Sequence, residues 1–282
     1  MPSSSSKRKF RFQVKHDSAD RALLNVGCGT RTDPSWNNLD FSPYALLRKR
    51  LWTVKMLRAI GFLSDERYQR LQEIDPSIIR WNLLRGIPFE DATFDVVYHS
   101  HFLEHLEHDA AIDFLRECYR VLKPIGILRI VVPDLEALTL AYRQAIDRLD
   151  RSGETPATEA AHEKSIAALF DQFVRRRSSG PTAQKKWVGT IEALLRGNAA
   201  ETGEKHRWMY DRHSLSRILT RIGFGSIQRY SAVTSGIAGW ERCFLDYYPS
   251  GAAYKANSIY VEATKIALPE ARRITEKEAK VA

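Results

Sequence analysis

Histidine is concentrated in one stretch of this 282-residue chain. An imidazole can accept a proton from a reacting hydroxyl near neutral pH, so a histidine cluster indicates a candidate general base. Four histidines stand within ten residues: His99, His101, His105 and His108. Later in the chain, His206 and His213 are further candidates.

The same spacing leaves a zinc site open as an alternative. His101 and His105 are four residues apart, and His105 and His108 are three apart, so a helix could bring either pair together. The chain contains no His-Glu-x-x-His sequence, and no clustered carboxylates indicate magnesium. We therefore expect no metal ligand.

A glycine-rich turn lies nearer the N-terminus. The short apolar run 23–26 ends in Gly27-Cys28-Gly29, and glycine lets the backbone adopt positive φ and approach a ligand closely. The turn is not the dinucleotide-binding fingerprint, because Thr32 stands where the third glycine would be, and no Gly-Lys-Ser/Thr of a P-loop follows. A plain tight turn remains the alternative interpretation.

Two further polar residues follow predicted strands. Asp40 could accept hydrogen bonds from a ribose diol, although a capping or surface aspartate has the same local pattern. Asn82 could contact an adenine edge while Leu83 packs against the ring. The order and spacing of these features are jointly more informative than any one of them.

Short apolar runs alternate with helical segments along the chain. A helix is predicted near 109–122 from its apolar face, and another after Asp211, ending at Gly223. The alternation predicts an α/β fold, a Rossmann-like doubly wound domain with a mostly parallel seven-stranded sheet, whose ligands bind beyond the carboxyl ends of the strands. The expected strands are 23–26, 38–41, 78–81, 94–98, 127–132, 224–230 and 258–263.

The chain divides into a catalytic domain and appended segments. The catalytic domain is expected in two parts, 21–134 and 206–268, separated by an inserted helical cap at 135–205. The remaining segments are a flexible basic arm at 1–20, an aromatic insertion at 231–255 and a charged tail at 269–282.

The positive charge is local. The formal net charge is +9, from 43 basic and 34 acidic residues, yet 1–16, 44–63 and 172–191 each hold five basic residues and no acidic one. This distribution points to an anionic acceptor or docking surface more than to a wholly basic fold. The chain has no apolar run long enough for a membrane span and no secretory signal, and its three scattered cysteines suit a reducing cytoplasm.

These segments together resemble class I S-adenosylmethionine-dependent methyltransferases. LLNVGCG resembles the first motif of that family and NNLD its second-strand acid, while RGIPFEDATFDVVYHSHFLEHL and YRVLKPIGILRIVVPDLE resemble the later strands. HRWMYDRHSLSRILTRIGF and NSIYVEATK are similar to a bacterial subgroup associated with surface-polysaccharide and glycan biosynthesis. The resemblance covers about residues 22–140 and 205–265.

The resemblance implies S-adenosylmethionine as cofactor. Asn82 stands where the family usually carries aspartate, but its carbonyl can still accept an adenine amino proton. The implied cofactor-binding residues are Asn25, Gly27, Gly29, Asp40, Asn82, Leu83, His99 and Ser100.

The resemblance also implies methyl transfer by in-line displacement, with a base where the acceptor is a hydroxyl. His101 and His105 are the first candidates for that base, and His206 and Asp134 are the others. Cys28 is expected to be a small packing residue.

The acceptor is expected to be a saccharide or another small-molecule hydroxyl compound, and an anionic or lipid-linked saccharide would suit the charge. The alternative is an RNA or other nucleic-acid methyltransferase that uses the basic arm and cap on phosphates. Membrane contact through 44–63 is a minor alternative. The aromatic residues of the insertion either stack on sugars or bases or pack the cap onto the core: Trp240, Phe244, Tyr247, Tyr248 and Tyr254.

Overall fold

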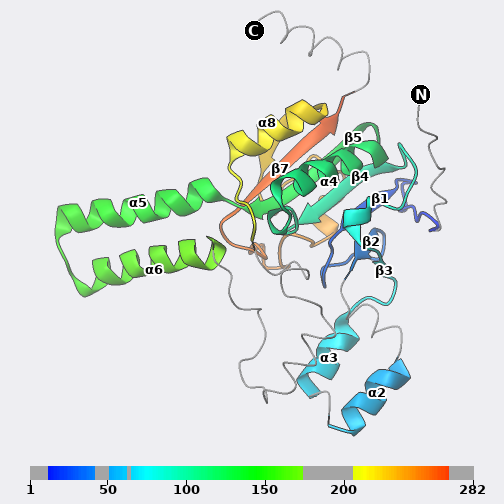
Figure 1. Cartoon of the computed structure of the whole chain (residues 1–282), viewed down its shortest axis with the longest axis horizontal. Helices are drawn as coiled ribbons and strands as arrows, with labels where there is room; N and C mark the ends of the chain where they lie inside the picture. The colour runs from blue at the N-terminus through cyan, green and yellow to red at the C-terminus, as the bar shows by residue number, and fades with distance from the viewer. Residues whose placement is uncertain (1–11, 42–50, 62–64, 174–205, 267–282) are drawn as a thin grey trace, which may run out of the picture.

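The computed structural model describes residues 12–41, 51–61, 65–173 and 206–266, which contain one seven-stranded sheet (Figure 1). The strand order is β3-β2-β1-β4-β5-β7-β6; β1 to β5 pair in parallel, and β7 is antiparallel to both neighbours. The Rossmann-like prediction is therefore confirmed. The strands are β1 (Leu23–Val26), β2 (Asn37–Asp40), β3 (Ile79–Arg80), β4 (Phe94–Ser100), β5 (Leu122–Pro133), β6 (Phe224–Tyr230) and β7 (Ser258–Lys265).

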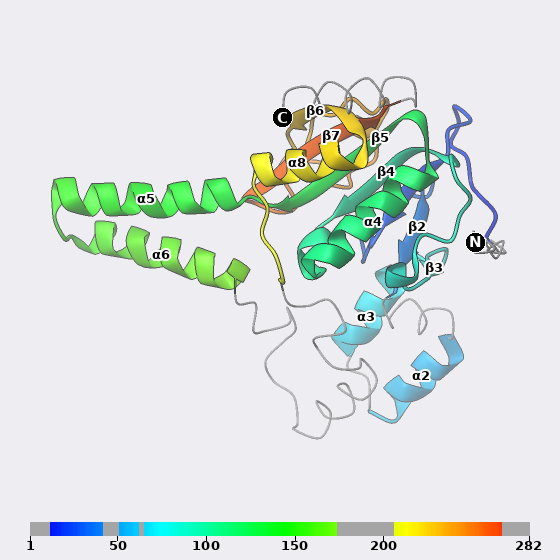
Figure 2. The ribbon, with the colours of Figure 1, turned by 45° about the horizontal axis from the view of Figure 1, so that its top comes forward.

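Two helices, α4 (His108–Val121) and α8 (Arg212–Ile222), cover one face of the sheet (Figures 1 and 2). The predicted face of α4 is buried there, although the helix begins at His108 and not at a cap on Asp109. Asp211 caps α8 as predicted, because its carboxylate accepts the N–H groups of residues 213 and 214. The segment Lys123–Gly126, expected to end α4, lies within the range of β5.

The opposite face of the sheet is covered by the aromatic insertion. Trp240 and Tyr247 are buried there beside Trp36 and Tyr98, so for these two insertion residues the packing interpretation is correct. The Tyr98 ring lies 5.5 Å from the Trp240 ring, with the two planes steeply inclined. A short 3₁₀ helix, η3 (Trp240–Arg242), places the Trp240 indole over this face.

A buried ionic network ties the insertion to the sheet. Arg129 of β5 is completely buried and donates to the carboxylates of Asp246, in the insertion, and Glu262, on β7. It also donates to two backbone carbonyls of the insertion. The Tyr98 hydroxyl donates to the other oxygen of Asp246 at 2.6 Å. One guanidinium thus joins two strands and the segment that crosses them.

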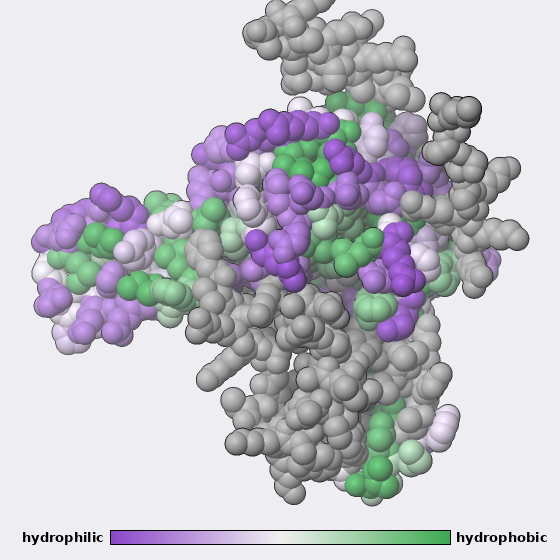
Figure 3. Space-filling view, viewed as in Figure 1, coloured by the Kyte–Doolittle hydropathy of each residue, from purple (hydrophilic) through white to green (hydrophobic). Residues whose placement is uncertain are grey.

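The expected cap has a different arrangement in its described part. Helices α5 (Leu135–Ser152) and α6 (Pro156–Phe173) form a hairpin that extends away from the sheet (Figures 1 and 2), so these residues do not lie over the strand ends. Hydrophobic side chains lie among hydrophilic ones along this hairpin in Figure 3, and Leu140 and Phe170 are both exposed.

Helices α2 (Leu51–Ala59) and α3 (Asp65–Glu73) pack beside the glycine-rich turn, as expected for a helix next to the donor site. Val54 is buried against Cys28 and Leu71 of α3. Trp52 and Met56 on α2, and Ile60 just after it, remain exposed. Figure 3 shows hydrophobic surface in this region.

Most of the basic arm and of the basic window 172–191 lies outside the described residues, as do 42–50 and the charged tail. In the described part, no helix is both long and apolar enough to cross a membrane.

Replacement of Arg129 by methionine should lower the free energy of unfolding by about 3–5 kcal/mol, because it leaves two carboxylates buried without their cation. Urea unfolding followed by circular dichroism measures the change. Arg116→Met is the matched control, since Arg116 forms an exposed ion pair with Asp113 on α4 and should change stability by less than about 1 kcal/mol. Equal effects of the two substitutions would contradict the role given to Arg129.

Candidate functional site

The glycine-rich turn follows β1 and faces the end of β4. Gly27 and Gly29 have φ of +66° and +54°, so both adopt the left-handed conformation that favours glycine. A Cβ on Gly27 would lie 2.7 Å from the ring of Phe102, whereas one on Gly29 would meet nothing within 4 Å. Gly27 therefore allows close packing, and the backbone at Gly29 is open to a ligand.

The predicted cofactor residues Asn25 and Asp40 hold the turn in place. The buried Asn25 amide donates to the Arg31 carbonyl at 2.8 Å and to the Asn38 side chain at 3.0 Å. An Asp40 carboxylate oxygen accepts the Gly29 N–H at 2.8 Å. The turn and the carboxylate that is expected to bind ribose are thus fixed to each other.

Asn82 and Leu83 lie next to Asp40 at the neighbouring strand end. The Trp81 N–H donates to the Asp40 carbonyl, and Asn82 then caps the short 3₁₀ helix η1 (Leu83–Arg85) by accepting the Leu84 N–H. Leu83 is buried beneath this turn. Parallel pairing of β1, β2 and β3 brings all of these positions to one edge of the sheet, as the sequence predicted.

A pocket opens between this turn, the end of β4 and the aromatic insertion. The turn contributes Gly27 to Arg31, β4 and the residue after it contribute Tyr98, Ser100 and His101, and the insertion contributes Leu245 and Tyr254, followed by Lys255. Asp40, Asn82 and Leu83 are outside its lining. The pocket is therefore next to the glycine turn and away from the expected adenosine contacts.

His99 does not face this pocket, which corrects its predicted place beside the donor. Successive side chains of a strand point to opposite faces, and His99 is buried on the α4 side, with its ring 5.2 Å from that of Phe114. Burial lowers the pKa of His99 to about 4, and among the described residues neither ring nitrogen has a hydrogen-bond partner. Its neighbour Ser100 does line the pocket, and its contact with the cofactor stays a prediction.

His101 reaches the pocket and is held on both ring nitrogens. Its Nδ1 lies 3.0 Å from a carboxylate oxygen of Glu104, and its Nε2 lies 2.9 Å from the hydroxyl of Ser258 on β7. The carboxylate can only accept, so Nδ1 carries a proton and Nε2 of the neutral ring is left as the acceptor. The backbone φ of +49° at His101 turns the chain sharply after β4.

Glu104 is the functional candidate that the sequence reasoning missed. It belongs to the 3₁₀ helix η2 (Leu103–His105) and is completely buried. Burial raises its pKa, but the hydrogen bond from His101 and the electrostatic interactions with His101 and His105 outweigh this, so the pKa of Glu104 lies below its usual value. The only local signal was a carboxylate three residues after a histidine.

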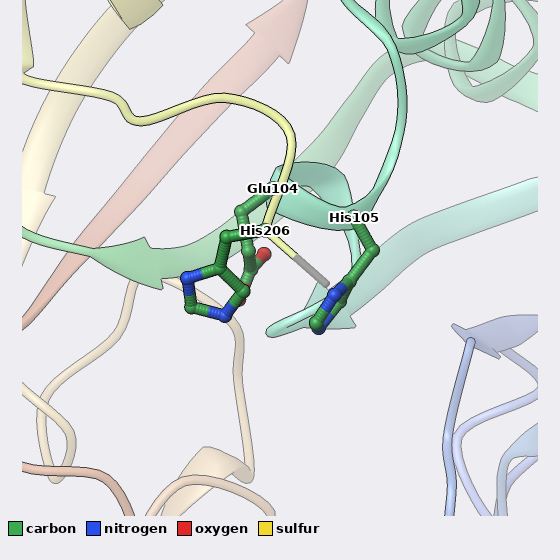
Figure 4. A group of neighbouring side chains, drawn as sticks. All are labelled: Glu104, His105 and His206. Atoms are coloured by element: carbon green, nitrogen blue, oxygen red, sulfur yellow. The ribbon is translucent and has the colours of Figure 1, made fainter. Parts of the chain in front are cut away.

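His105 and His206 lie together beside Glu104 (Figure 4). Their ring centroids are 4.8 Å apart, and Nε2 of His206 lies 3.9 Å from the Glu104 carboxylate. His108 instead packs against Trp208, with ring centroids 4.6 Å apart. The structure therefore pairs His105 with a histidine distant in sequence, and neither of the local pairs expected from the spacing forms such a ring pair.

Asp134 and Cys28 have structural roles. Asp134, predicted as a candidate base, is the N-cap of α5: it is buried and accepts the N–H groups of Glu136 and Ala137. It is also outside the pocket lining. Cys28 is buried against Val54, and burial raises the pKa of its thiol, so packing is its expected role.

A comparison with known families matches the part of the chain that contains the parallel strands β1 to β5. Residues 24–130 match the family described as "Methyltransferase domain", and they contain the glycine turn, Asp40, Asn82 and most of β5. This part of the chain is similar to a methyltransferase domain. S-adenosylmethionine is the cofactor that this similarity indicates. A comparison with curated proteins finds no match.

The chain also has distant likenesses among solved structures. An S-adenosylmethionine-dependent methyltransferase from Archaeoglobus fulgidus is 13% identical with a TM-score of 0.36, covering 86% of this chain and 85% of that one. A 1,6-didemethyltoxoflavin-N1-methyltransferase from Burkholderia thailandensis is 14% identical with a TM-score of 0.38, covering 87% of this chain and 71% of that one. This chain spans 48% of the CurJ carbon methyltransferase, at 13% identity and a TM-score of 0.36 over 87% of this chain. Such distant likenesses carry no information about the acceptor.

Asp40→Ala should weaken S-adenosylmethionine binding at least tenfold, because it removes the carboxylate that is expected to accept hydrogen bonds from the ribose diol. Isothermal titration calorimetry with the cofactor analogue S-adenosylhomocysteine measures the change. Asp113→Ala, an exposed substitution on α4, is the control and should leave affinity unchanged. An Asp40→Ala protein with wild-type affinity would overturn the assignment of the cofactor site.

The buried neutral His99 should make stability depend on pH. The unfolded chain protonates this histidine below its ordinary pKa of 6.5, whereas the folded chain does so only near 4, so the unfolded state binds more protons between these values. Stability should fall by up to about 1.4 kcal/mol per pH unit as pH drops through this window. His99→Leu should remove this contribution. Urea midpoints at several pH values test this, and an unchanged pH slope in the variant would contradict it.

Proposed function

We propose that the protein transfers the methyl group of S-adenosylmethionine to a hydroxyl of a saccharide or other small molecule, with His101 as general base. The observation that carries the proposal is the position of His101. It lines the pocket beside the glycine turn, and its acceptor nitrogen already meets a hydroxyl, that of Ser258. The second nitrogen is fixed by the Glu104 carboxylate.

For methyl transfer to a hydroxyl, the protein has to orient the donor and the acceptor and to provide a general base. The sulfonium donor is already activated, so the acceptor oxygen attacks the methyl carbon in line, a C–O bond forms and the C–S bond breaks to release S-adenosylhomocysteine. The hydroxyl proton passes to Nε2 of His101. The Glu104 carboxylate then stabilises the resulting imidazolium, as the aspartate carboxylate does in a Ser-His-Asp triad.

The rim of the pocket suits an anionic saccharide. The Arg31 guanidinium lies 3.8 Å from the centre of the Tyr254 ring, and the Lys255 ammonium lies 5.6 Å from it. All three residues line the pocket. Two cations around one aromatic ring offer both charge and a stacking surface to a sugar that carries a carboxylate or phosphate.

The nucleic-acid alternative depends on residues 1–16 and 172–191, of which only 12–16 and 172–173 are described. It therefore stays a prediction, as do the glycan-biosynthesis subgroup and the cytoplasmic location. An assay with labelled S-adenosylmethionine across glycan, lipid and RNA fractions separates the acceptors. Label recovered in RNA alone would contradict the proposal.

His101→Asn should lower kcat by about 10²–10⁴ while cofactor affinity stays within threefold, because only proton transfer is lost. Asparagine is the suitable replacement, since it tolerates the positive φ at this position. Turnover with the identified acceptor gives kcat, and calorimetry with S-adenosylhomocysteine gives the affinity.

His213→Asn is the control for His101→Asn, because His213 is exposed on α8 and should leave kcat unchanged. A His101→Asn protein with wild-type kcat would rule out His101 as the general base.

A further inference from the structure

Glu104, His105 and His206 form a cluster that the proposed methyl transfer does not use as a unit. Each offers one ligand atom, and these atoms all lie within 4.8 Å of one another. Figure 4 shows Glu104 and His105 extending from η2 and His206 descending from the segment before α8, with the two imidazoles on either side of the carboxylate. We propose that these three side chains bind a divalent transition-metal ion of the zinc type.

The donor set favours this class of metal. Two imidazoles and one carboxylate are a common zinc-binding set in sites that keep a position open, whereas magnesium and calcium prefer oxygen ligands alone. Ligand atoms around a tetrahedral zinc lie about 3.4 Å apart, as follows from zinc–ligand distances of about 2.0–2.1 Å. The observed cluster needs to contract by little more than about 1 Å, which small side-chain rotations can supply.

The backbone already holds the two ligand segments together. The Glu104 carbonyl accepts the N–H of Arg207 at 2.7 Å and, more weakly, that of Trp208 at 3.3 Å. An ion pair between Arg207 and Glu107 adds a second link. The segment that carries His206 is thus fixed against η2, although about a hundred residues separate it from Glu104 in the chain. The backbone of both ligand segments is therefore in place, and only the side chains need to rotate.

The hydrogen bonding of the Glu104 carboxylate supports metal binding independently of the ligand geometry. Its side chain is completely buried; Oε1 meets Nδ1 of His101, but among the described residues Oε2 has no hydrogen-bond partner. An ionised carboxylate buried with half of its acceptor capacity unused is costly. A divalent cation bound on the open oxygen would offset that cost, and the His101 hydrogen bond would then orient the metal-bound carboxylate, as outer-shell partners do.

The site would lie one side chain away from the pocket, because His101 touches both Glu104 and the pocket. Three protein ligands leave at least one coordination position for water or another oxygen ligand. Metal binding does not rest on the proposed reaction, since it can be measured on the protein without donor or acceptor.

The test is metal binding by the full-length protein after treatment with a chelator and dialysis. Competition with a chromophoric chelator gives the Zn²⁺ affinity, and Co²⁺ as a probe gives visible absorption bands that report nitrogen and oxygen ligands. The wild-type protein should bind one Zn²⁺ per chain in preference to Mg²⁺, and bound Zn²⁺ should raise the melting temperature.

Two variants and a control localise the ion. His105→Gln and His206→Gln should each weaken Zn²⁺ binding by about 100-fold or more and abolish the Co²⁺ bands, with circular dichroism showing that each variant is folded. His213→Gln, an exposed histidine on α8, should bind as the wild type does. Failure of the folded wild type to bind Zn²⁺ stoichiometrically, a preference for Mg²⁺, or unchanged binding in both variants would overturn the proposal.

Discussion

The arrangement of the pocket depends on one buried charge, the guanidinium of Arg129, which must be paired inside the protein. A charge inside a protein must be paired and hydrogen-bonded, and Arg129 meets this requirement with Asp246 and Glu262 together with two carbonyls of the aromatic insertion. The insertion therefore has to cross this face of the sheet. That crossing places Tyr254 and Lys255 opposite the glycine turn and so closes the pocket.

A second buried charge, that of Glu104, organises the other side of the pocket. Its carboxylate meets His101 and lies beside His105 and His206, while its backbone carbonyl holds the segment that carries His206. The proposed base and the proposed metal ligands thus share one residue. The two buried charges differ in how fully they are hydrogen-bonded. Every side-chain nitrogen of Arg129 donates a hydrogen bond, whereas one carboxylate oxygen of Glu104 has no hydrogen-bond partner among the described residues.

Structural features that depend on residues close together in the sequence were predictable from the sequence. The order of the strands, the glycine turn and the capped helix after Asp211 follow from local patterns of apolar residues, glycine and capping side chains. The adjacency of Asp40 and Asn82 was also predictable, because parallel strands place their carboxyl ends at one edge. The errors were local as well: Asp134 caps a helix, and the side of β4 on which His99 lies depends on a register that a run of buried residues does not reveal.

By itself the sequence determined the Rossmann-like sheet, the cofactor turn and the histidine-rich stretch after β4, because each is encoded within a few consecutive residues. Only the tertiary structure decided which histidines meet, what orients His101, and which aromatic residues pack and which line the pocket. These contacts join η2 to a segment about a hundred residues away and β5 to the insertion. Which residues form these contacts depends on buried charges and backbone hydrogen bonds between segments that are distant in the sequence. The spacing of residues within one segment therefore does not predict them.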